Sequence, residues 1–206
     1  MTYTTKQLSP ETWSDFERLF ARGTGWGFCA CMFFQRGRHL PHADFPERET
    51  MRRKNLAEKR ALVVAGLAHG ILVYNDNQPV GWCQFGPPEE LPLRGGGRTA
   101  RRIPPTGANV RWRITCFVTA VGHRRRGVAG MALRAALSAI RERGGGLVEA
   151  YPAVPPIRAD WEHGGTIALF AREGFRIVGP AYPPYVVMQR VIRPIERPHT
   201  RMTKRK

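Results

Sequence analysis

The chain has 206 residues, of which 42% are hydrophobic and 10% aromatic, so it is long and apolar enough for one globular domain and is not a disordered chain. Its formal net charge of +17 is uneven: residues 91–206 carry 22 Lys and Arg against six Asp and Glu, whereas residues 1–90 carry 11 against 10. This asymmetry favours a polyanionic partner, such as a phosphorylated cofactor, an acidic substrate or a nucleic acid. An arginine-rich surface without a partner explains the scattered arginines, but not the run Arg124–Arg126 beside glycines.

The sequence contains no apolar run of the roughly 20 residues that a bilayer requires, and its N-terminus lacks the apolar core of a secretory signal. We therefore expect a cytoplasmic protein without membrane contact. Four cysteines are too few for a disulfide framework in a chain of this length, and their spacing matches no zinc motif. His39 and His42 are the only nearby ligands for a metal at Cys29 and Cys31, at unconvincing spacing, so we expect buried thiols and no metal.

Hydrophobic periodicity and turn residues predict the elements of the first half in chain order. They are a helix over 10–20 that opens at Ser9, a strand or buried turn over 29–34, a helix over 46–68, a β-hairpin formed by 71–74 and 80–85, and a Pro/Gly/Arg loop over 86–108.

The second half is predicted to alternate strands and helices. The strands cover 110–118, 147–151, 175–178 and 186–192, and the helices cover 127–143 and 165–172. This order predicts a mixed α/β fold around one sheet, in a domain over 1–195. Residues 196–206 are polar and basic, and we expect a disordered tail.

The segment Arg124-Arg-Arg-Gly127-Val-Ala129-Gly130 lies between a predicted strand and a predicted helix. Small residues allow a ligand to approach the backbone, and the N–H groups and dipole at a helix N-terminus attract anions. The segment lacks the Gly-Lys-Ser/Thr of a phosphate-binding P-loop. A dinucleotide fold would place its glycines directly after the strand, whereas Val118 precedes Gly127 by nine residues.

The pattern Arg124-x-x-Gly127-x-Ala129 resembles the signature of GNAT-superfamily N-acetyltransferases. The preceding strand, the amphipathic helix and the next strand are similar to that family, as is Phe170-Ala-Arg-Glu-Gly174-Phe175. The resemblance covers roughly residues 5 to 193 and implies a mostly antiparallel central sheet flanked by helices. Two departures are the missing proline before the signature and Phe170, which stands where many relatives carry a tyrosine acid.

The resemblance also implies where acetyl-CoA binds as a co-substrate, between the strand that ends at Val118 and the strand 147–151. The backbone of Cys116, Phe117 and Val118 is expected to pair with the pantetheine arm. The pyrophosphate is expected at the turn and the first helical residues, which are Arg124, Arg125, Arg126, Gly127, Val128, Ala129 and Gly130.

Glu149 is the only acid in the strand 147–151, and it is our candidate for the general base that accepts the proton of the attacking amine. The alternative is a carboxylate that faces solvent or pairs with an arginine. Tyr151 lies two residues further on the same face of the strand and is a candidate proton relay or acid. Its alternative role is ordinary aromatic packing.

We therefore expect an acetyl-CoA-dependent N-acetyltransferase that transfers the acetyl group by direct attack of a primary amine. The acceptor is a small molecule or a protein that the sequence does not identify. A second hypothesis is a nucleic-acid- or ribosome-associated module that keeps this fold and contacts a polyanion through its basic tail. A nicotinamide-dependent enzyme is disfavoured, because only one βαβ-like unit is present.

Overall fold

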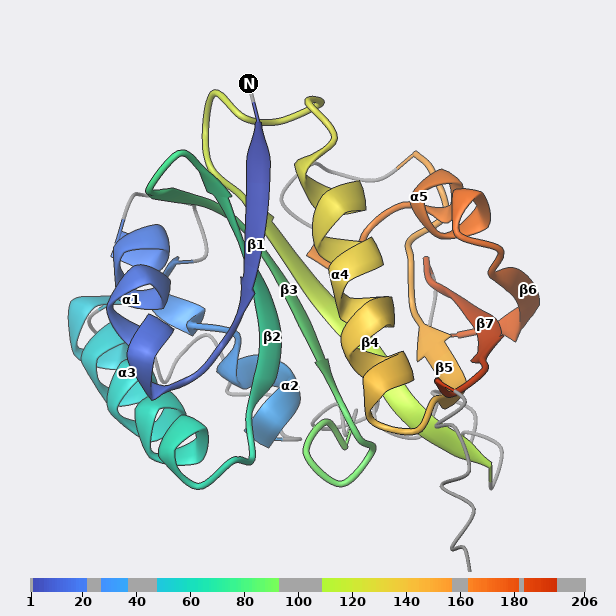
Figure 1. Cartoon of the computed structure of the whole chain (residues 1–206), viewed down its shortest axis with the longest axis horizontal. Helices are drawn as coiled ribbons and strands as arrows, with labels where there is room; N and C mark the ends of the chain where they lie inside the picture. The colour runs from blue at the N-terminus through green and yellow to red at the C-terminus, as the bar shows by residue number, and fades with distance from the viewer. Residues whose placement is uncertain are drawn as a thin grey trace, which may run out of the picture.

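The computed structural model describes residues 2–21, 27–36, 48–92, 109–156, 163–181 and 184–195. Its centre is a seven-stranded sheet with the order β1-β2-β3-β4-β5-β7-β6 (Figure 1). All neighbouring strands are antiparallel except β4 and β5, which are parallel and are connected through α4. The predicted mixed α/β fold with a mostly antiparallel sheet is confirmed.

The strands are β1 (Tyr3–Gln7), β2 (His69–Asn75), β3 (Gln78–Gly86), β4 (Val110–Thr119), β5 (Gly146–Ala150), β6 (Arg176–Pro180) and β7 (Val186–Ile192). The α-helices are α1 (Trp13–Ala21), α2 (Met32–Arg36), α3 (Arg48–Val64), α4 (Val128–Glu142) and α5 (Ile167–Arg172). Short 3-10 turns, η1 (Pro10–Thr12) and η2 (Gly27–Cys29), precede α1 and α2. None of the helices in the described ranges has the length and apolar character needed to cross a membrane.

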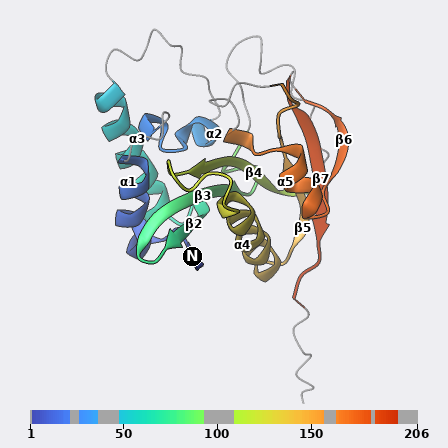
Figure 2. The ribbon, with the colours of Figure 1, turned by 90° about the horizontal axis from the view of Figure 1, so that it is seen from above.

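Helices cover both faces of the sheet, and neighbouring residues of β3 show how. Trp82 is fully buried against Phe16 of α1, with ring centroids 4.9 Å apart. Gly81 faces the other way, and a Cβ atom at this position would lie 2.3 Å from Cγ1 of Val128 in α4. The missing side chain therefore lets the first turn of α4 approach the sheet closely. Figure 2 shows α2 and α4 on opposite sides of the central strands.

The amphipathic pattern of α4 buries one side of the helix in the core, as the sequence predicts. The buried residues include Val128, Ala132, Leu133, Ala136 and Ile140. Arg141 follows at the solvated C-terminal end, where a cation complements the helix dipole. This packing fixes the N-terminal end of α4 relative to β4, and the candidate site lies at that junction.

Most predicted elements are confirmed, with ends that shift by a few residues. The segment 29–34 is a buried turn that continues into helix α2, so a strand at this place is wrong. The strand β1 was not predicted; it pairs with β2 at one edge of the sheet. Most of the predicted loop over 86–108 and the basic tail 196–206 lie outside the described residues.

Candidate active site

The site is built around the point where β4 and β5 stop pairing. Their parallel register runs from Val110–Leu147 to Ile114–Ala150, whereas β4 continues to Thr119 along β3. Beyond Ile114, no strand of the described ranges pairs with β4 on its β5 side, and Figure 1 shows β4 extending past the short β5. The backbone of residues 116–118 therefore presents an edge that an extended ligand can pair with as an added strand.

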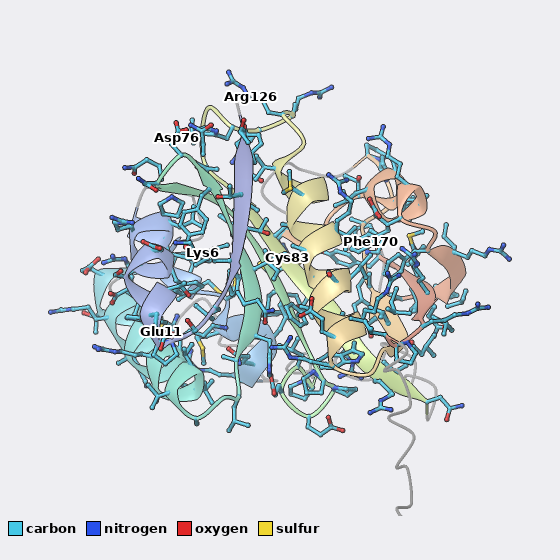
Figure 3. The ribbon with its side chains drawn as sticks, in the orientation of Figure 1. Lys6, Glu11, Asp76, Cys83, Arg126 and Phe170 are labelled. Carbon is cyan, nitrogen blue, oxygen red and sulfur yellow. The ribbon has the colours of Figure 1, made fainter. Side chains whose placement is uncertain are left out.

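The turn between β4 and α4 has the backbone of an anion site. Gly127 lies at the N-cap of α4 with a φ of 83°, in the left-handed region that glycine adopts without a steric penalty. The three arginines 124–126 are exposed, and Arg125 also has a positive φ of 59°. Figure 3 shows Arg126 at the end of the molecule where β4 passes into α4. Helix N–H groups and formal positive charge thus coincide at one place, beside the open edge of β4.

Phe170 lies in the core, at the position where the signature noted above often has a tyrosine. Its side chain is fully buried, and its ring packs edge-to-face on Phe117 of β4 at a centroid distance of 5.9 Å. The ring of Phe175 also packs edge-to-face with Phe170, at a centroid distance of 5.1 Å. A phenylalanine offers no proton at this position, so Phe170 supports β4 by packing and any acid must come from elsewhere.

Glu149 and Tyr151 form a hydrogen-bonded pair. The Tyr151 hydroxyl donates to Oε2 of Glu149 at 2.5 Å, and Nε2 of Gln189 on β7 donates to Oε1 at 2.6 Å. Glu149 is only 2% exposed, whereas Tyr151 is partly exposed and directly follows the last paired residue, Ala150. The carboxylate therefore lies behind the tyrosine, and Tyr151 is the member of the pair that a molecule from outside meets first.

A buried arginine of β4 places positive charge near Tyr151. Arg113 lies directly opposite Glu149 in the β4–β5 register and is 5% exposed, and its Nη1 donates to the carbonyl of Leu91 at 2.6 Å. Burial raises the pKa of Tyr151 far above its ordinary value, and the hydrogen bond to Glu149 and the charge of Glu149 raise it further, whereas Arg113 lowers it. Tyr151 therefore remains a neutral phenol at physiological pH.

The structure brings the sequence-predicted residues together in two groups along β4. The residues 116–118 lie on the open edge that leads to the turn 124–130, and Glu149 with Tyr151 lies near the end of the paired part. Arg113 and Gln189 were not predicted from the sequence, because only strand pairing between distant segments places them opposite Glu149. Three of the four cysteines are buried, as expected, and Cys29 is partly exposed; the contact between Sγ of Cys31 and Sγ of Cys116, at 3.1 Å, was not predicted. Within the described ranges, no group of His, Cys, Asp and Glu residues has the arrangement of a metal site.

Comparison with solved structures shows the same fold in acetyltransferases. PaiA N-acetyltransferase from Thermoplasma acidophilum, solved in complex with coenzyme A, superposes with a TM-score of 0.54 at 11% identity, over 93% of this chain and 99% of that one. The ribosomal-protein-S5-alanine acetyltransferase from Vibrio fischeri gives 0.52 at 11% identity, over 93% and 94%. The histone acetyltransferase HPA2 and related acetyltransferase from Corynebacterium glutamicum gives 0.54 at 16%, over 97% and 99%.

Comparison by sequence gives two results. No curated protein matches the chain. The family model described as acetyltransferase (GNAT) family matches residues 34–176, which is more than half of the chain and includes β4, the arginine turn, α4 and β5. With this match and the shared fold, the chain belongs to the GNAT family of acetyltransferases and is an acyltransferase.

Proposed function

We propose that this acetyltransferase moves the acetyl group of acetyl-CoA onto a primary amine by direct attack of the amine on the thioester. One observation carries the proposal: the open edge of β4 leads directly into a turn with three exposed arginines and a helix N-terminus. An extended arm that ends in a diphosphate matches these two features in their order along the chain.

In this proposal, the backbone of Cys116, Phe117 and Val118 binds the pantetheine arm as an added strand. The N-terminal N–H groups of α4, from Val128 to Gly130, bind the diphosphate, and Arg124, Arg125 and Arg126 add positive charge. Gly127 keeps the approach to the backbone open, because among the described residues other than its chain neighbours, no atom lies within 4 Å of a Cβ built there. A backbone N–H near Phe117 or Val118 stabilises the negative charge that develops on the thioester oxygen.

The acceptor amine must lose a proton to attack, and we assign this transfer to Tyr151 and Glu149 together. The amine contacts the phenol oxygen of Tyr151, whose own proton already points at Oε2 of Glu149. As the amine proton moves to Tyr151, the Tyr151 proton moves to Glu149, so no tyrosinate forms and the raised pKa of Tyr151 is no obstacle. The amine nitrogen then bonds to the acetyl carbon, and the carbon–sulfur bond breaks. The second proton that the nitrogen loses passes to the departing sulfur, so CoA leaves as the thiol.

Two single variants and their combination test this relay. Glu149→Gln keeps the size of the side chain but cannot accept the proton, and Tyr151→Phe removes the phenol. We expect each to lower the rate at saturating substrate by about 10²–10⁴ at neutral pH, and the double variant to lose no more than the worse single one, because the pair acts as a unit. The loss should shrink at high pH, where the amine arrives neutral.

The exposed acid Glu142, at the far end of α4, provides the matched control. Glu142→Gln should keep full activity, and all variants should keep their affinity for acetyl-CoA, because the arginine turn and the β4 backbone are unchanged. Pre-steady-state rates and calorimetric titration measure the two properties. Full activity of Glu149→Gln at neutral pH would assign the proton to water and contradict the relay.

The acceptor is a small-molecule amine or an amine of a protein. The V. fischeri neighbour, whose described substrate is a ribosomal-protein alanine, supports testing peptide N-termini beside polyamines, amino acids and aminoglycosides. A turnover screen that follows the release of free CoA and identifies acetylated products by mass tests the function directly. Binding of acetyl-CoA without turnover on any amine pool would favour a binding module.

The uneven charge favours a second candidate function for that case, a nucleic-acid- or ribosome-associated module. Residues 91–206 carry 22 Lys and Arg, of which Arg197, Arg201, Lys204, Arg205 and Lys206 belong to the tail. Phosphate contacts by these residues make binding salt-dependent, because each neutralised phosphate releases counterions. Retention on RNA that weakens with salt, together with absent turnover, would support this alternative.

A further inference from the structure

The thiols of Cys31 and Cys116 come from distant parts of the chain and meet in the interior. Cys31 precedes α2, Cys116 lies in β4, and a hydrogen bond of 3.1 Å joins their Sγ atoms. A disulfide needs a sulfur–sulfur distance of about 2.05 Å, so the two sulfur atoms must approach each other by roughly 1 Å. Both cysteines are free and buried, at 3% and 8% exposure.

A β-bulge directs Cys116 toward this partner. The register of β3 and β4 shifts between Gln84–Cys116 and Phe85–Ile114, which leaves Thr115 as the extra residue of β4. Bulges of this kind change the direction of a side chain and are frequent next to active sites. Thr115 donates to Gln84 at 3.1 Å, which fixes the bulged strand on the face that carries Cys31.

The segment that contains Cys31 is likewise held in place, by hydrogen bonds to its backbone. Ala30 and Cys31 both have positive φ values, 45° and 49°, which are uncommon for residues other than glycine. Two buried amides hold the segment in this conformation: Nε2 of Gln84 donates to the carbonyl of Cys31 at 3.0 Å, and Nδ2 of Asn55 donates to that of Phe28 at 2.7 Å. The fold thus maintains an unfavourable backbone that places the Cys31 thiol against Cys116.

A buried ammonium lies beside the pair. Lys59 of α3 is fully buried, donates to Gln35, and has its Nζ 5.8 Å from the ring centroid of Trp82. Burial lowers the pKa of Lys59 to about 8, while the neighbouring Cys31, Cys116, Cys29 and Glu90 raise it, so the amine is still charged at pH 7. Burial opposes ionisation of Cys31, but the hydrogen bond with Cys116 and the charge of Lys59 outweigh it and lower its pKa.

We propose that Cys31 and Cys116 form a reversible oxidation site that closes to a disulfide when the protein meets a peroxide. The Cys31 thiolate attacks one peroxide oxygen and becomes a sulfenic acid, with release of hydroxide. The Cys116 thiol then displaces this oxygen as water and forms the S–S bond, so two thiols are oxidised and one peroxide is reduced. A small dithiol reverses the step by thiol–disulfide exchange.

The site also controls acetyl transfer, and this consequence rests on the proposed function. Cys116 belongs to the part of β4 whose backbone is proposed to hold the pantetheine arm, next to the thioester. Closing the disulfide draws Cys116 toward Cys31, and a misplacement of about 1 Å near reacting groups is enough for a loss of about 100-fold. We expect the oxidised enzyme to transfer acetyl at least about tenfold more slowly, with recovery after dithiothreitol.

The test treats the full chain with hydrogen peroxide and maps the products by mass spectrometry without reduction. We expect a linked peptide that joins Cys31 and Cys116 and a loss of two hydrogen atoms from the intact mass. Cys31→Ser and Cys116→Ser should abolish the link. Cys29→Ser is the matched control and should keep it, because Cys29 is two residues away from Cys31 and burial raises its pKa to about 11.

A Lys59→Met variant tests the role of the ammonium without removing a thiol. We expect the disulfide to form more slowly, since loss of the Lys59 charge raises the pKa of Cys31 and lowers its thiolate fraction. Circular dichroism confirms that each variant is folded. No linked peptide in the folded wild type, or an equal yield from the Cys31→Ser variant, would overturn the proposal. Because peptide mapping does not depend on catalytic activity, it tests the disulfide even if the protein transfers no acetyl group.

Discussion

Gly127 gives a prediction that separates backbone strain from ligand binding. Gly127 has a φ of 83°, and in the described part of the chain no atom beyond its immediate neighbours lies within 4 Å of a Cβ built at this position. A Gly127→Glu side chain therefore meets no packing obstacle, and the left-handed backbone alone should cost about 1–2 kcal/mol of folding stability. The new carboxylate, however, would lie at the proposed diphosphate site.

The expected loss of affinity follows from Coulomb's law. A unit negative charge about 6 Å from a phosphate charge, at an effective dielectric constant of about 20, gives a repulsion of about 3 kcal/mol. This energy corresponds to an affinity for acetyl-CoA about 100-fold weaker. Isothermal titration at low ionic strength measures the affinity, and the loss should decrease as salt is added.

Gly66 provides a matched control for this variant. It lies between α3 and β2 with a φ of 72°, and a Cβ there also has open space. Gly66→Glu should cost the same 1–2 kcal/mol in urea unfolding but leave the affinity for acetyl-CoA unchanged. Unchanged affinity in Gly127→Glu, or equal losses in both variants, would refute the assignment of the turn.

The remaining predictions concern the tail, the packing of α4 and the buried lysine. Deletion of residues 196–206 should leave acetyl-CoA affinity intact, while chromatography on immobilised RNA should show weaker retention if the tail binds nucleic acid. Gly81→Ala should destabilise the fold by about 1–3 kcal/mol in denaturant unfolding, because its Cβ would meet Val128, and a second change, Val128→Ala, should relieve part of that loss. The folded state binds fewer protons than the unfolded state between the lowered pKa of Lys59, about 8, and its ordinary 10.5. The contribution of Lys59 to the free energy of unfolding should therefore rise by about 3 kcal/mol between these two pH values. Comparing the unfolding free energies of the wild type and Lys59→Met over this pH range measures the rise.

The sequence predicts the sheet and its main helices because their hydrophobic patterns are strong and local. It does not predict β1, where four of the five side chains are exposed and pairing with β2 determines the structure. It also leaves 29–34 ambiguous, because an apolar run suits a strand, a turn or a helix. The turn at Ala30 and Cys31 is imposed by Gln84 and Asn55, which lie far away in the chain.

The candidate site is also predictable only in part, where its residues are close together in the sequence. The turn around Gly127 is predictable because its glycine, arginines and helix start are contiguous. Glu149 is predictable as an acid in an apolar strand, but its burial behind Tyr151 depends on the register with Arg113 and the bond from Gln189. The meeting of Cys31 with Cys116 depends on a single bulged residue, which no periodicity in the sequence indicates.

The sheet consists of two antiparallel blocks, which are joined by the short parallel pairing of β4 with β5. One block contains β1 to β4, the other contains β5, β7 and β6, and the register between them ends at Ile114 and Ala150. A molecule bound along the unpaired part of β4 would contact both blocks and stabilise the connection between them. Amide exchange in β5 and β7 should then slow when acetyl-CoA is bound, although these strands lie beyond the β4 edge. Bound acetyl-CoA would thus stabilise the sheet, and the sheet of the free enzyme would open more readily than that of the complex.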